Sequence, residues 1–71
     1  MNYQTLNKML ADKGLMNYRV FKDNGEYELR KMPYFYRESV VFSSKDILTV
    51  RDYIQDMKRG QITKGAWNEF L

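Results

Sequence analysis

The segment Asp23-Asn24-Gly25-Glu26 restricts the possible folds of this chain more than any other part of it. Asn-Gly is the preferred pair for a two-residue type I′ turn, because both central positions of that turn need a positive φ. Apolar and polar residues alternate on both sides of the pair, as they do in half-buried strands. We therefore predict a hairpin in which Val20 faces Leu29.

This register sorts the hairpin side chains onto two faces, because directly opposed residues share a face. The face expected in the core carries Tyr18, Val20, Tyr27 and Leu29, with Lys22 and Lys31 at its ends. The other face carries Arg19, Phe21, Asp23, Glu26, Glu28 and Arg30. We expect that second face to meet solvent or a partner. Arg19 opposite Arg30 would repel, and Glu28, diagonal to Arg19, can offset the repulsion.

A proline interrupts the chain after the hairpin, since Pro33 has no N–H to donate to a strand ladder. Alternation resumes from Tyr34 to Phe42, and we predict a third strand over about residues 39–43. Residues 34–37 are either the bent beginning of that strand or a separate short strand.

Apolar spacing predicts a helix before the hairpin. Its apolar residues follow i, i+3, i+4 spacing: Leu6, Met9 and Leu10. Asn2 or Thr5 can cap its start, and Gly14 is a natural left-handed residue after its end. Leu15, just past the glycine, is expected to fold back onto the last turn.

A second helix is expected directly after the third strand. A serine of Ser43-Ser44 would cap it, with Asp46 close behind, and Gly60 would end it. Its apolar stripe consists of Ile47, Val50, Ile54 and Met57, with Tyr53 on the flank. A last helix would begin at Thr63 and run to the C-terminus, docking Trp67 and either Phe70 or Leu71.

The predicted order is α-β-β-β-α-α, and residues 1–71 are expected to form one α+β domain. We predict a three-stranded antiparallel sheet with the helices packed on one face. A chain of 71 residues has room for a single thin core. The sequence lacks a basic and apolar leader, and no apolar run approaches the roughly 20 residues that span a bilayer. We therefore expect a cytoplasmic protein with no membrane contact.

The order α-β-β-β-α is similar to that of the double-stranded RNA-binding domain. That family begins its second helix with a lysine cluster that contacts phosphates. The matching stretch here, Ser44-Lys45-Asp46-Ile47-Leu48-Thr49, has one lysine followed at once by an acid. The likeness is therefore limited to element order, and it assigns no family.

The composition removes most catalytic chemistry, because the chain has no histidine and no cysteine. Common general bases, thiol nucleophiles and soft-metal ligands are thus missing together, and no glycine-rich phosphate loop is present. The best carboxylate pair is Asp52 and Asp56, spaced i, i+4 on the second helix. They could hold Mg²⁺, but a solvated helix face explains them better. We expect no enzyme, no cofactor and no metal site.

The remaining features indicate binding. The candidate partner-binding residues are Tyr34, Phe35, Tyr36, Arg37, Leu48 and Arg51. Tyrosine and arginine are enriched at interface hot spots, and alternate residues of a strand cannot all face one core. In the opposing interpretation, Tyr34 and Tyr36 fill the core and Phe35 covers an edge. Leu48 would then be a lone exposed leucine, or one covered by the first or last helix.

We favour a non-enzymatic protein-binding module, a small inhibitor or regulator that docks on a larger protein. Its size and its Tyr-, Asn- and Lys-rich composition are typical of phage or mobile-element products. The alternative is a small basic nucleic-acid-binding protein, since the net charge is +3. Its contacts would come from Arg19, Arg30, Lys31, Arg51, Lys58 and Arg59. The thin core and exposed aromatics also favour self-association.

Overall fold

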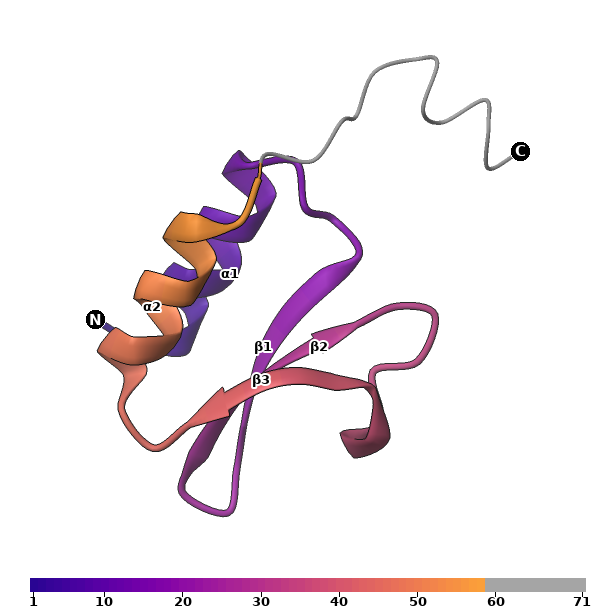
Figure 1. Cartoon of the computed structure of the whole chain (residues 1–71), viewed down its shortest axis with the longest axis vertical. Helices are drawn as coiled ribbons and strands as arrows, with labels where there is room; N and C mark the ends of the chain where they lie inside the picture. Colours follow the sequence, from indigo (N-terminus) through magenta and orange to yellow (C-terminus); the bar gives the residue numbers. More distant parts are fainter. Residues whose placement is uncertain (59–71) are drawn as a thin grey trace.

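A computed structural model describes residues 1–58 and confirms the α+β class, with the order α-β-β-β-α (Figure 1). The elements are α1 (Tyr3–Asp12), β1 (Tyr18–Asp23), β2 (Glu26–Lys31), the 3₁₀ helix η1 (Arg37–Ser39), β3 (Val40–Ser44) and α2 (Ile47–Asp56). The helix expected from Thr63 and the stop expected at Gly60 lie outside the described residues. Neither described helix has the length and apolar character needed to cross a bilayer.

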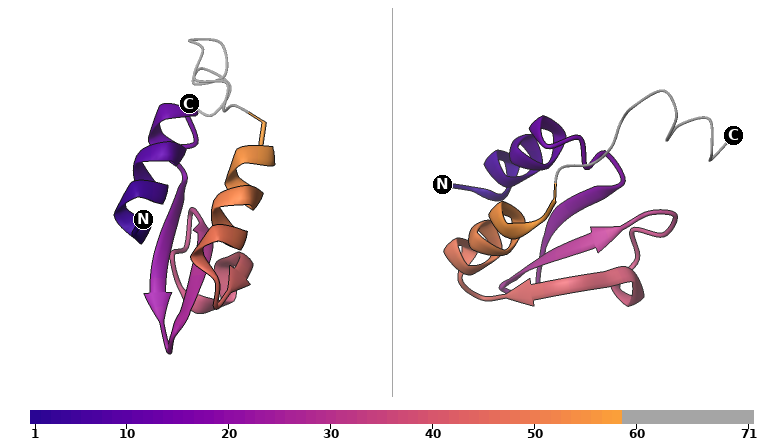
Figure 2. Two further views of the ribbon diagram at one scale, coloured as in Figure 1. Left: turned by 90° about the vertical axis from the view of Figure 1, so that its left-hand side faces the viewer. Right: turned by 45° about the horizontal axis from the view of Figure 1, so that its top comes forward.

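The three strands form an antiparallel sheet in the order β1-β2-β3. β1 and β2 pair in the predicted register, with Val20 opposite Leu29. Asn24 and Gly25 have φ values of 54° and 76°, as a type I′ turn requires. Both helices cover one face of this sheet (Figure 2). The opposite face is called the far face below.

The core lies between the sheet and the two helices. Its buried residues are Leu6, Leu10, Leu15, Val20, Leu29, Val50 and Ile54. The partly buried residues packed against them are Met9, Tyr18, Tyr27, Phe42, Ile47 and Met57. Tyr53 flanks this stripe, as predicted, and its ring stacks on Phe42 at 4.3 Å between centroids. Burial of each large apolar side chain contributes about 1.5–3 kcal/mol.

The first helix is capped at both ends by local hydrogen bonds. The side chain of Asn2, and not that of Thr5, is the N-cap: its Oδ1 accepts from the Thr5 N–H at 3.0 Å. Gly14 takes a φ of 77°, and the Leu15 N–H then donates to the Leu10 carbonyl at 2.8 Å. This is a Schellman stop, and it folds the buried Leu15 back onto the core as predicted.

The start and end of α2 differ from the prediction. Asp46 is the N-cap, since its Oδ1 accepts from the Leu48 N–H at 2.9 Å. Ser44 belongs to β3, and its hydroxyl accepts from the Asp46 N–H instead of capping the helix. The helix ends before Gly60, with Met57 as an extended C-cap. An Asp cap is as effective as a Ser cap, so local preference did not separate the two.

The third strand begins at Val40, one residue later than predicted, because Ser39 closes η1. Its register on β2 shifts between Leu29 and Arg30, so that Phe42 faces Leu29 while Val40 faces Arg30. The extra residue, Val41, is exposed. Such a bulge makes a strand edge less suitable for pairing with another chain.

The side chain of Asn7 covers the outer edge of β1. Its Nδ2 donates to the Val20 carbonyl at 3.2 Å, and its Oδ1 accepts from the Val20 N–H at 2.6 Å. These two hydrogen bonds fix α1 against the sheet and satisfy backbone groups that a free edge would leave open.

The carboxyl ends of α1 and α2 lie side by side (Figure 1). Two aligned helix dipoles repel at such a junction, because both ends carry partial negative charge. Lys13, the C-cap of α1, offsets this repulsion. Its Nζ donates to the carbonyls of Ile54, Gln55 and Met57, the last two at 2.7 Å.

We predict that Lys13→Met lowers the free energy of unfolding by about 2 kcal/mol, because charge-assisted hydrogen bonds to the α2 carbonyls are lost. Urea unfolding followed by far-UV circular dichroism measures the change. Lys8→Met, at an exposed position of the same helix, is the matched control and should stay within about 0.5 kcal/mol of wild type. Equal effects of the two substitutions would contradict the role of Lys13.

Candidate binding site

The segment between β2 and β3 is not a strand, contrary to both sequence interpretations of residues 34–37. It turns at Met32-Pro33, whose peptide bond is cis, and enters η1 at Arg37. The Tyr36 carbonyl accepts from the Ser39 N–H at 2.9 Å and from the Ser39 hydroxyl at 2.6 Å. These local bonds replace a strand ladder. Residues Met32–Tyr36 are called the tyrosine loop below.

Phe35 turns inward and covers part of the far face. Its ring lies 5.7 Å from that of Phe21 at 52°, and its side chain is half-buried. Its carbonyl accepts from Arg30 Nη1 at 2.7 Å. The far face is therefore covered here by the loop, and the expectation that it meets solvent is wrong at this point.

The burial of Glu28 is the clearest departure from the sequence prediction. Glu28 is 3% exposed, although its strand position suggested a solvated side chain. Its Oε1 accepts from Arg30 Nη2 at 2.6 Å and from Arg30 Nε at 3.1 Å. The Arg30 side chain is 11% exposed and stacks over the Phe21 ring at 4.5 Å. Glu28 thus pairs with Arg30, the residue opposite Arg19, so its negative charge lies beside one member of that like-charged pair.

A second arginine extends this ion-pair network. Arg37 pairs with Asp23 and lies 3.5 Å from Glu28 Oε2. Asp23 also lies 3.7 Å from Arg30 Nη2. Two arginines therefore balance two carboxylates, and within residues 1–58 no buried side-chain nitrogen or oxygen lacks a hydrogen-bond partner. The network has no charge left over to attract an ion.

Tyr34 and Tyr36 point the opposite way from Phe35. They are 62% and 63% exposed, and their rings stack at 6.2 Å between centroids with 23° between planes. Met32, beside them in the loop, is exposed as well. The interpretation in which both tyrosines fill the core is therefore wrong. Phe35 is half-buried against Phe21, and its role as a partner contact stays a prediction.

The tyrosine loop is tied to the rest of the fold at its first residue. The Met32 N–H donates to the Asn17 carbonyl at 2.7 Å, in the turn before β1. Sequence reasoning missed Met32 as a candidate. Phe21, an aromatic residue on a face of charged side chains, was the available signal that something covers that face.

Leu48 and Arg51 do not join the tyrosine loop. The loop precedes β3 and α2 follows it, so the five residues of β3, roughly 16 Å at the usual rise, separate the two places (Figure 1). Leu48 is exposed, which leaves it uncovered by α1. Arg51 donates to Asp52 at 2.9 Å on the same helix. The predicted partner-binding set therefore divides into two places.

The basic residues of the nucleic-acid alternative are also dispersed. Arg30 is held by Glu28, and the Lys31 ammonium lies 5.7 Å from the Tyr18 ring at a strand end. Arg51 and Lys58 belong to α2 and the residues just after it, and Arg59 lies outside the described residues. Arg19 and Arg30 are opposed on β1 and β2, and Lys31 follows Arg30 in β2, so the described members of this set lie in two places, the β1–β2 pair and α2 with the residues just after it.

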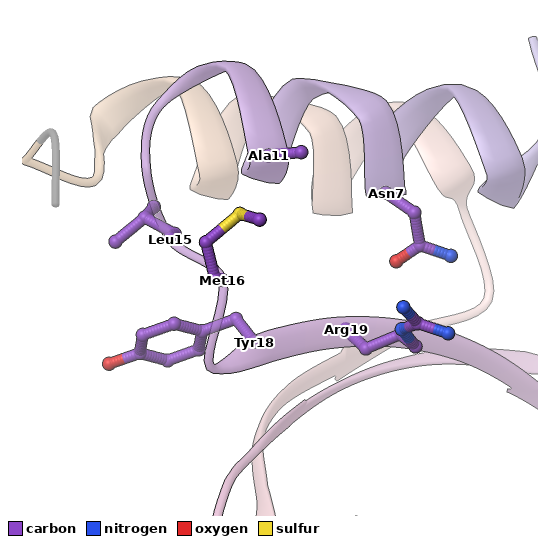
Figure 3. A pocket seen from close by; sticks show the side chains of 6 residues that line it. All are labelled: Asn7, Ala11, Leu15, Met16, Tyr18 and Arg19. Atoms are coloured by element: carbon purple, nitrogen blue, oxygen red, sulfur yellow. The ribbon is translucent and has the colours of Figure 1, made fainter. Parts of the chain in front are cut away.

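Arg19 lines a small notch between α1 and β1 (Figure 3). The other lining residues are Asn7, Ala11, Leu15, Met16 and Tyr18. The notch has a volume of about 80 Å³, well below the several hundred Å³ of a typical ligand pocket.

Asp52 is one of the two acids considered for Mg²⁺, and it pairs with Arg51. No group of three potential metal ligands occurs within residues 1–58.

Comparison with family models, curated proteins and solved structures gave no match for this chain. Any functional inference therefore rests on the residues and geometry described above.

We predict that Glu28→Gln lowers the free energy of unfolding by about 3 kcal/mol, because it leaves the buried Arg30 guanidinium without its main charge partner. Chemical denaturation measures the change. Glu38→Gln, at an exposed position, serves as the control and should cost less than about 0.5 kcal/mol. A neutral Glu28→Gln variant would show that the pair does not stabilise the far face.

Proposed function

We propose that this protein is a non-enzymatic binding module that docks on a larger protein through the tyrosine loop. The observation that carries the proposal is the exposed, stacked pair of Tyr34 and Tyr36 on a loop whose backbone is tied down. Tyrosine joins a large apolar contact area to a hydrogen-bonding end, and it dominates many protein-binding surfaces.

The fixed backbone of the loop supports this choice. Binding costs free energy when a mobile loop has to be ordered, and a loop ordered in advance avoids that cost. Here Arg30 holds the Phe35 carbonyl, Ser39 holds the Tyr36 carbonyl and Asn17 holds the Met32 N–H. The two tyrosines and Met32 are thus presented without a partner being present.

The charges near the loop favour a protein partner over nucleic acid. Arg30 and Arg37 are both paired with carboxylates, so neither is free to neutralise a phosphate without losing its present partner. A module that works by occupying a surface of its target acts as an inhibitor or a regulator. Self-association through the same aromatic side chains belongs to this proposal.

We also propose a cytoplasmic location and a phage or mobile-element origin. The absence of cysteine fits a reducing compartment. The small size and the Tyr-, Asn- and Lys-rich composition support the origin.

The test uses a partner captured by the wild-type chain, purified, and titrated in a defined two-component assay. We expect the double variant Tyr34→Ala/Tyr36→Ala to bind about 30-fold more weakly, the effect of losing a hot spot of about 2 kcal/mol. Tyr3→Ala, a tyrosine on α1 that is also exposed, is the matched control and should bind as wild type does. Unfolding curves of all variants should coincide within about 0.5 kcal/mol.

Two outcomes would contradict the proposal. The first is unchanged affinity of the double variant for a partner that the wild type binds at defined stoichiometry. The second is nucleic-acid binding whose affinity falls with salt at a log–log slope of roughly −3, which would support the alternative function. Sedimentation of the free chain separates self-association from partner binding.

A further inference from the structure

One side chain, Arg30, connects the buried ion pair of the far face with the tyrosine loop. Its Nε and Nη2 donate to Glu28 Oε1, and its Nη1 donates to the Phe35 carbonyl at 2.7 Å. Its guanidinium also lies over the Phe21 ring, on which Phe35 packs. Its Nη2 also lies 3.7 Å from Asp23 Oδ2. The guanidinium therefore joins the ion-pair network to the backbone of Phe35 and to the ring on which Phe35 packs.

We infer that Arg30 is the positioning residue of the proposed binding site, and that it sets the geometry of the tyrosine loop from the far face of the sheet. The inference rests on the proposed function for its link to binding. Phe35 lies between Tyr34 and Tyr36 in the chain. Holding its carbonyl and its ring keeps Phe35 turned inward, and the two neighbouring side chains then point outward.

The geometry requires arginine and not merely a positive charge. The planar guanidinium donates in two directions at once and offers a flat face to an aromatic ring. The ammonium of lysine is a point donor that can pair with Glu28 but cannot hold the Phe35 carbonyl and cover Phe21 at the same time. Arg30→Lys therefore keeps the charge pair and removes the connection to the loop.

Both members of the Glu28–Arg30 ion pair are shielded from solvent. Glu28 is 3% exposed and the Arg30 side chain 11%. Salt screens such a pair much less than it screens surface charges. The loop geometry is therefore expected to hold over a wide range of ionic strength.

The experiment compares the wild type with Arg30→Lys, and with Lys8→Arg as the charge-conserving control. Lys8 lies at an exposed position of α1, on the helix-covered side of the sheet, and belongs to no candidate binding set. The first readout needs no partner: backbone ¹⁵N relaxation of residues 34–37 and the nuclear Overhauser contact between the Phe21 and Phe35 rings. The second readout is the affinity for the partner that the wild type binds.

We expect Arg30→Lys to keep the core contacts of the wild type while the order parameters of residues 34–37 fall from about 0.85 to below about 0.6. The Phe21–Phe35 contact should weaken and the partner affinity should drop about tenfold. Lys8→Arg should change neither readout. Phe21→Leu, which keeps Arg30 but removes the ring beneath it, should loosen the loop as well and provides a second variant should Arg30→Lys not fold.

The outcomes separate this inference from the proposed function. An ordered loop in both Arg30→Lys and Phe21→Leu overturns the inference and leaves the proposed function standing. A loosened loop with full affinity for the partner also overturns it, because positioning would then not matter for binding. A loosened loop in a protein whose tyrosine variants bind normally supports Arg30 as the group that orders the loop, and refutes the proposed function.

Discussion

The rest of the structure depends on the register that the Asn24-Gly25 turn imposes on β1 and β2. Because opposed residues share a face, this one turn sends Val20 and Leu29 toward the helices and Glu28 toward the far face. A shift by one residue would exchange the two sets completely. The apolar core and the ion-pair network would then both lose their partners, so the turn sets both sides of the sheet together.

The two faces of the sheet are held by different kinds of interaction. Between sheet and helices the contacts are apolar and non-directional, and they supply most of the stability. On the far face the contacts are charged and directional. A buried ion pair adds little net stability, since the cost of desolvation offsets much of its attraction. Its consequence here is geometric. The hydrogen bond to Glu28 orients the Arg30 guanidinium, and Arg30 in turn donates to the Phe35 carbonyl.

This division explains how so small a protein can present an ordered aromatic surface. The apolar core lies between the sheet and the helices, whereas the tyrosine loop packs on the far face. The loop is therefore held by contacts outside that core. Phe21 and Phe35 provide a small apolar contact, and the Arg30 guanidinium lies over the Phe21 ring. Tyr34 and Tyr36 are left outside because each alternates with the inward Phe35. An exposed tyrosine pair on an ordered loop is the feature from which we propose protein binding.

The sequence by itself determined what depends on neighbours a few residues apart: the turn and its register, the Gly14 stop and the apolar stripes of both helices. These follow from backbone conformation and periodicity, which act locally. The sequence left Asn2 and Thr5 as alternative caps of α1. Tertiary structure alone decided the burial of Glu28, the inward turn of Phe35 and the reach of Lys13 to α2. The two-residue period separated Phe35 from Tyr34 and Tyr36, as the structure has them, but it did not show which side would turn inward, and no local pattern shows that a loop will cover a charged face. The candidate site was therefore located by its residue types, whereas its geometry came from contacts between residues distant in the chain, such as Met32 with Asn17 and Phe35 with Phe21.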